Sequence, residues 1–132
     1  MLRINSAKHL LLLAIFAAPA ALSQETLNIA SKRFTESYIL GEIVTQTARR
    51  ADETPVFHKP GLGNTAILFA ALQTGSAAAY PEYTGTIARE LLKIEDASIA
   101  EINRELTPLG LAASIPFGFA NNYALAMLEA KA

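Results

Sequence analysis

Residues 26–51 read TLNIASKRFTESYILGEIVTQTARRA, and a change of period within this stretch decides the fold class. Polar and apolar side chains alternate over Thr26–Ala30, which predicts a short strand. From Thr35 to Ala51 the apolar side chains recur at helical spacing, which predicts a helix packed on a sheet. The expected buried face of this helix consists of Ile39, Leu40, Ile43, Val44 and Ala48.

The alternation of strand and helix continues along the chain, whose 132 residues fit one domain. Further strands are expected at Thr54–His58, ended by Lys59-Pro60-Gly61, and at Ala77–Tyr80. Helices are expected from the Asn64 cap to Gly75, over Thr84–Lys93, and from the Ser98–Glu101 capping box to Pro108 and Gly110. An extended segment is expected at Phe117–Leu128, with a helix from Ala124 onward as the alternative. This order predicts an α/β fold with a largely parallel sheet flanked by helices.

The first 23 residues differ in character from the rest. Arg3 and Lys8 precede an uninterrupted apolar run, Leu10–Ala18, and Pro19 and small residues follow it. This order is typical of a signal peptide, here with cleavage after Ser23, although an amphipathic or buried helix is an alternative. The run is about half the ~20 residues of a membrane-spanning helix. Because the chain has no cysteine to carry a lipid, we expect a soluble periplasmic protein rather than a lipoprotein.

The composition excludes several classes of protein. Hydrophobic residues make up 52% and charged residues 17%, which is too apolar for a disordered chain. The absence of cysteine excludes a disulfide scaffold and cysteine-ligated metal. A formal net charge of -1 argues against a nucleic-acid partner, which needs a basic face.

Few residues offer catalytic chemistry. His58 is the one histidine outside the first 23 residues, and we expect it to be solvent-exposed at a strand end. A single histidine offers little basis for a hydrolase triad or a histidine-based metal site, so neither an enzyme nor a cofactor is expected.

Two turns could contact a ligand. The turn Gly61–Thr65 precedes a helix start, where an anion is favoured, but a simple tight turn is an equal alternative. The stretch Tyr80–Thr86, YPEYTGT, places two tyrosines and two hydroxyls after a strand, where open α/β sheets bind ligands. Tyrosine rings attract cations, although these rings could instead cover the sheet edge.

Four stretches, taken together, resemble the substrate-binding proteins of osmoprotectant ABC transporters. They are IASKRFTESYILGEI at 29–43, GLGNTAI at 61–67, YPEYTGT at 80–86 and PFGFANNYALAM at 116–127. The resemblance implies import of glycine betaine, choline, carnitine or proline betaine, with a membrane permease and, through it, an ATPase as partners. Which of these solutes is preferred is left open.

The resemblance also implies a periplasmic-binding-protein type II-like fold, in which two α/β lobes close on a ligand. Residues 1–23 would be the signal peptide, 24–116 lobe I, and 117–132 the start of the crossover into a second lobe that this sequence lacks. A truncated form with impaired binding is therefore expected. The alternative is a non-functional fragment or an interaction module without a transport role.

The implied ligand-binding residues come from the matching stretches. Tyr83 and Tyr123 resemble members of a tyrosine cage around the ammonium group, with Tyr80 as a secondary candidate. Lys32 and Thr86 resemble polar contacts to the ligand, and Asn121 a neighbour of the cage. For Lys32, simple solvent exposure is the alternative.

Overall fold

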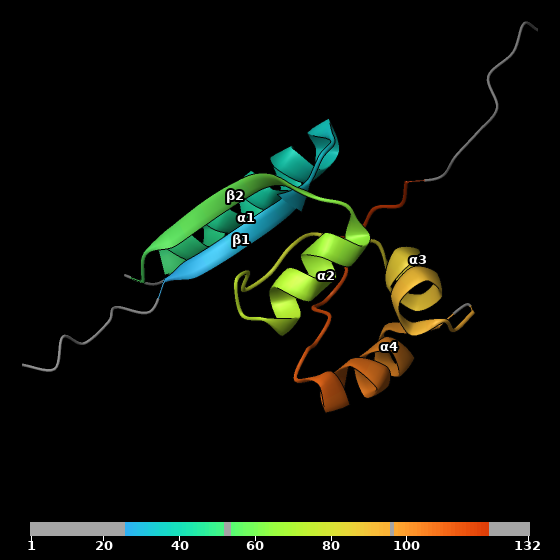
Figure 1. Cartoon of the computed structure of the whole chain (residues 1–132). Helices are drawn as coiled ribbons and strands as arrows, with labels where there is room; N and C mark the ends of the chain where they lie inside the picture. Colours follow the sequence, from blue (N-terminus) through green and yellow to red (C-terminus); the bar gives the residue numbers. More distant parts are fainter. Residues whose placement is uncertain (1–25, 52–53, 96, 122–132) are drawn as a thin grey trace, which may run out of the picture.

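Strands β1 (Leu27–Lys32) and β2 (Val56–Gly63) form a two-stranded parallel sheet in the computed structural model, which describes residues 26–51, 54–95 and 97–121. The register pairs Leu27 with Val56, and an irregularity after Ala30 places Lys32 opposite Gly63. Parallel strands need a crossover connection, which helix α1 (Thr35–Ala51) supplies. Figure 1 shows α1 lying along one face of this sheet.

β2 continues through the Lys59-Pro60-Gly61 run that was expected to end it. The expectation was wrong because β2 lies at the edge of the sheet, with β1 as its one paired neighbour among the described strands. Proline is tolerated on an edge strand, since its missing N–H leaves the paired side intact.

The segment expected as a third strand, Ala77–Tyr80, forms only an isolated parallel bridge with β1. The Ala30 N–H donates to the Ala79 carbonyl at 2.9 Å, and the Ala78 N–H donates to the Asn28 carbonyl at 2.8 Å. The segment therefore lies along the side of β1 opposite β2. It delivers the following residues, Pro81–Tyr83, to the carboxyl end of β1.

Helix α1 has the predicted bounds, but its most buried face lies beside the expected one, of which Leu40, Val44 and Ala48 are half-buried. Its buried residues are Ser37, Gly41 and Thr45, whereas Ile39 and Ile43 are each more than half exposed. A stripe of small residues lets the helix approach the sheet closely. The buried hydroxyls are satisfied, since Thr45 donates to the Gly41 carbonyl at 2.8 Å and Ser37 accepts from the Lys32 N–H at 2.8 Å.

Helix α2 (Thr65–Gln73) begins at the predicted cap, where the Asn64 side chain accepts from the Ile67 N–H. Gly75 follows its end with a φ of +72°, a left-handed conformation that glycine adopts without strain. The first core cluster joins this helix to β1 and consists of Ala30, Leu68, Ala71 and Ala77.

The helix expected over Thr84–Lys93 is present in two parts. A short α3 (Thr84–Thr86) passes directly into a π-helix, η1 (Ile87–Leu92), which ends at Lys93 with a φ of +59°. The wider π-helical turn is uncommon and is often found near functional sites.

The last helix, α4 (Ile99–Leu106), begins with the predicted capping box between Ser98 and Glu101 and continues into a 3-10 turn, η2 (Thr107–Leu109). A second core cluster joins α4 to η1 and consists of Ile87, Ala88, Ile102 and Leu106. Residues 111–121 have no regular secondary structure and run back from α4 past α2 (Figure 1). The later part of the expected Phe117–Leu128 extension lies outside the described residues.

Candidate ligand-binding site

The Glu82 carboxylate holds together the turn that connects the Ala77–Tyr80 segment to α3. Its Oε1 accepts from Lys32 Nζ at 2.7 Å and from the Tyr83 N–H at 2.9 Å. The two charged side chains are 11% and 5% exposed, for Lys32 and Glu82 respectively. Lys32 is therefore held in a largely buried ion pair and is not simply solvent-exposed.

The second oxygen of the Glu82 carboxylate, Oε2, is buried and has no hydrogen-bond partner in the part of the chain that the structure describes. The hydroxyl of Tyr80 interacts electrostatically with the Glu82 carboxylate. Burial, and then the negative charge of Glu82, raise the pKa of Tyr80, so its phenol stays protonated at neutral pH.

A second polar cluster links Tyr83 to two distant segments. Asn121 Nδ2 donates to the Tyr83 hydroxyl at 3.2 Å and to Glu36 Oε2, in the first turn of α1, at 3.0 Å. Burial and a hydrogen bond to the Glu36 carboxylate raise the pKa of Tyr83, and the Asn121 hydrogen bond partly offsets this. The structure therefore brings together two of the residues that the resemblance implied, Tyr83 and Asn121.

A cavity of about 100 Å³ lies beside this cluster and is walled largely by aromatic rings. Four rings line it, and they come from three separate segments: Phe34, Tyr83, Phe117 and Phe119. The rings of Phe117 and Phe119 are stacked, with centroids 6.3 Å apart and planes 19° apart. Ser37, Leu40, Pro81, Glu82, Thr84 and Pro116 complete the lining. We call this space the aromatic cavity.

A larger cavity of about 320 Å³ adjoins it and shares Glu82 and Thr84. Tyr80 lines this second space together with apolar residues of α2, η1 and α4. Thr86 lines neither cavity, and Thr84 occupies the position that the sequence suggested for it. Tyr123 lies outside the described residues.

The sequence reasoning did not single out Phe34, Phe117, Phe119 or Glu82 as site residues. Glu82 stands inside the YPEYTGT motif, and the three phenylalanines stand inside two of the other matching stretches. The available signal was therefore an aromatic residue inside three of the four stretches, but nothing in the spacing indicated that the rings meet.

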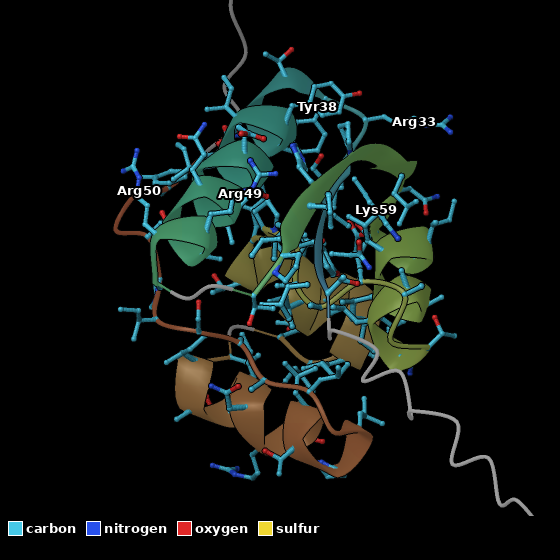
Figure 2. The ribbon with its side chains drawn as sticks, turned by 90° about the vertical axis from the view of Figure 1, so that its left-hand side faces the viewer. Arg33, Tyr38, Arg49, Arg50 and Lys59 are labelled. Carbon is cyan, nitrogen blue, oxygen red and sulfur yellow. The ribbon has the colours of Figure 1, made fainter. Side chains whose placement is uncertain are left out.

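A third, open cavity of about 440 Å³ lies beside the Gly61–Thr65 stretch, lined by Lys32, Arg33 and the start of α2. Gly61 has a φ of +66°, and Arg33 Nε donates to its carbonyl at 3.0 Å. Figure 2 shows Arg33 beside Tyr38 at this end of the molecule, far from Arg49 and Arg50. Gly61 and Gly63 therefore belong to the irregular end of β2, with Lys32 and Arg33 beside them, and the expected simple tight turn at Gly61–Thr65 is not formed.

His58 is not solvent-exposed, contrary to the expectation, because its side chain is only 12% exposed. Its Nε2 lies 2.9 Å from the Ser31 hydroxyl and its Nδ1 lies 3.1 Å from Glu42 Oε2. This order of groups resembles a hydrolase triad, but Ser31 is completely buried, so a substrate has no access to its hydroxyl.

Within residues 26–51, 54–95 and 97–121, no three histidine or acidic side chains gather in a way that could hold a metal ion. The helices in the same ranges are all too short or too polar to cross a membrane.

A parallel sheet flanked by helices, with cavities at the carboxyl end of a strand, defines an α/β ligand-binding lobe. The arrangement is that of a partial lobe of a type II binding protein. The chain belongs, more specifically, to the family described as the substrate binding domain of ABC-type glycine betaine transport systems, whose model matches residues 25–132. Domains of this family are non-catalytic solute-binding components of ABC transporters for betaine-type solutes.

Proposed function

We propose that this protein captures quaternary ammonium osmoprotectants of the glycine betaine and choline class in the periplasm. It passes the solute to a membrane permease, whose associated ATPase drives import. Residues 1–23 act as the export signal, and no lipid holds the mature protein to the membrane. The family membership supports the transport role, and the aromatic cavity supports the chemical class of the solute.

The observation that carries the proposal is the group of four aromatic rings around one small cavity that also contains a carboxylate. The face of an aromatic ring attracts a cation, and a quaternary ammonium is the cation that such cages bind in proteins. The Glu82 carboxylate, ion-paired with Lys32, lies in the same wall. A solute without a cationic group gains nothing from the aromatic rings.

Binding by the chain alone is weak in this proposal. Phe34, Phe117 and Phe119 are between 41% and 58% exposed, so a bound cation keeps part of its hydration. Each exposed ring then contributes about 0.5–1 kcal/mol. We expect a dissociation constant weaker than micromolar for the isolated chain.

The test compares choline and glycine betaine with 3,3-dimethyl-1-butanol, a neutral isostere of choline, by ligand-observed NMR. The two solutes with a quaternary ammonium group should bind, and the isostere that lacks this group should not. Phe34→Ala should weaken binding about two- to fivefold, the effect of one exposed cation–π contact. Phe57→Ala is the matched control, because Phe57 is a comparably exposed phenylalanine on β2 that lines none of the three cavities.

Equal binding of the neutral isostere would contradict the proposal, as would equal effects of Phe34→Ala and Phe57→Ala. The periplasmic location has its own test. Fractionation of cells that express the full chain should recover a shortened protein in the periplasm, whereas a chain without residues 1–23 should stay in the cytoplasm.

A further inference from the structure

Two of the four rings of the aromatic cavity belong to a segment without regular secondary structure. Phe117 and Phe119 are 58% and 53% exposed, so burial contributes little to holding them in place. Their rings nevertheless stack on each other. Within the described part of the chain, the hydrogen bond that residues 114–120 form is local, from the Ser114 hydroxyl to the Ile115 carbonyl. The position of the two rings therefore depends on how this segment is attached at its ends.

One end of the segment is attached to α4 through the side-chain amide of Asn103. Asn103 Nδ2 donates to the Ala113 carbonyl at 2.9 Å, and the Ala113 N–H donates to Asn103 Oδ1 at 2.6 Å. Because one planar amide pairs with both backbone groups of Ala113, it fixes the direction of the chain as well as its position. Ala113 is also the last described residue of the chain that packs against the second core cluster.

The other end of the segment is attached through Asn121, which donates to the Tyr83 hydroxyl and to the Glu36 carboxylate. These two hydrogen bonds are exposed, so water competes for the same groups. The two hydrogen bonds between Asn103 and Ala113 are partly buried. The attachment at Asn103 is therefore the stronger of the two.

The chain between Asn103's partner and the rings has little conformational freedom. The ring of Pro116 fixes its own φ and restricts the preceding residue, Ile115, to an extended backbone. Pro116 itself lines the aromatic cavity. A change in the position of Ala113 is therefore carried along the chain to Phe117, which follows the proline directly.

We propose that Asn103 is a positioning residue of the ligand-binding site, although it lines none of the three cavities. It acts through Ala113 and holds Phe117 and Phe119 at the aromatic cavity. The other two rings of the cavity come from different segments and do not depend on this attachment. A solute then meets all four rings only while Asn103 is paired with Ala113. This inference rests on the proposed function, since it concerns the same cavity.

The experiment measures choline binding to the full chain by NMR, with nuclear Overhauser contacts from the choline methyl protons to the phenylalanine rings at saturating choline. Asn103→Ala should weaken binding about four- to tenfold, more than the loss of one exposed ring, because two rings move together. The contacts from choline to Phe117 and Phe119 should disappear, whereas those to Phe34 should remain. Asn103→Asp keeps the acceptor for the Ala113 N–H and loses the donor, so its affinity should lie between those of Asn103→Ala and the unmodified chain.

Ser98→Ala is the matched control, because it removes hydrogen bonds of the capping box on the same helix and lines none of the cavities. Asn103→Ala and Ser98→Ala should each lower the melting temperature by about 4–8 °C. Ser98→Ala should nevertheless leave the affinity and the choline contacts unchanged. If Asn103 served stability alone, the two variants would bind choline equally.

The outcomes separate this inference from the proposed function. If choline binds the unmodified chain, and Asn103→Ala binds it equally well or keeps the contacts to Phe117 and Phe119, the role of Asn103 is refuted and the proposed function stands. If choline does not bind the unmodified chain, the proposed function fails and the inference fails with it. If Asn103→Ala does not fold, the comparison of Asn103→Asp with Ser98→Ala decides the question in the same way.

Discussion

Nε2 of His58 lies 2.9 Å from the hydroxyl of Ser31, which joins strand β2 to strand β1 through their side chains. The other ring nitrogen, Nδ1, lies 3.1 Å from Glu42 on α1. A neutral imidazole satisfies both contacts when Nδ1 donates to the carboxylate and Nε2 accepts from the hydroxyl. The His58 ring on β2 thus contacts both β1 and α1, and it links these three elements near the end of β1 that carries Lys32.

Replacing Gly41 with alanine should destabilise the protein by about 1–3 kcal/mol, because the packing around it has no room for a methyl group. A Cβ at this position would lie 2.6 Å from His58 Nε2 and 3.1 Å from Ser31 Cβ. Urea unfolding measures the effect. Gly85→Ala is the matched control, since a Cβ there meets nothing within 4 Å and should leave stability unchanged or slightly higher. Equal stability of the two variants would show that α1 does not pack this closely.

Replacing Ser31 with alanine should also lower stability, by about 1–3 kcal/mol. In the native protein, Ser31 Oγ contacts His58 Nε2 and accepts a weak hydrogen bond from the Gly61 N–H at 3.4 Å. The substitution removes this shared partner from both groups. Thermal melting by circular dichroism measures it. Ser114→Ala removes an exposed hydroxyl instead and should have no measurable effect. A loss no larger than that of Ser114→Ala would mean that the Ser31–His58 contact is not formed.

The capping box of α4 should make stability fall in acid. Hydrogen bonds from Ser98 to the Glu101 carboxylate lower the pKa of Glu101 below its ordinary value of 4.5. A carboxyl group with a lowered folded-state pKa contributes stability above the unfolded-state pKa and loses it as the pH falls through the folded-state pKa. Glu101→Gln should therefore weaken the dependence of the melting temperature on pH between about pH 5 and pH 3. An unchanged slope would contradict the prediction.

Replacing Asn121 with alanine should raise the pKa of Tyr83. The Asn121 hydrogen bond lowers that pKa, whereas burial and the Glu36 carboxylate raise it, so loss of the amide leaves the raising effects unopposed. The titration of the tyrosine ring carbons by NMR measures the change. A pKa that falls or stays constant would show that the segment around Asn121 does not lie against Tyr83 in solution.

The sequence predicted the helices better than their packing. The bounds of α1 followed from its period, but Ser37, Gly41 and Thr45 share a helix face as regularly as the isoleucines do. Which face is buried depends on how closely the sheet approaches, and a pattern of hydrophobicity contains no information about that distance. The expectation of a buried Ile39 and Ile43 was wrong for this reason.

Only part of the candidate site could be predicted, because the sequence indicates local motifs but not contacts between distant segments. The attraction of the YPEYTGT turn for a cation follows from its tyrosines, and the structure places Tyr83 in the wall of the aromatic cavity. The ion pair between Lys32 and Glu82 joins residues that are 50 positions apart, and the ring cluster joins residues from three segments. Such contacts depend on the tertiary fold, so residue types and local spacing did not indicate them.

The π-helix η1 has a consequence for insertions and deletions. Its turn contains about one residue more than an α-helical turn, and one residue corresponds to about 100° of helical rotation. Because the wide turn absorbs this extra residue, removing one residue from Ile87–Leu92 should convert it to an α-helical turn without a rotation of about 100° of the Tyr80–Thr86 turn relative to the core formed with α4. The chain can therefore change its length by one residue at η1 while the binding turn keeps its direction.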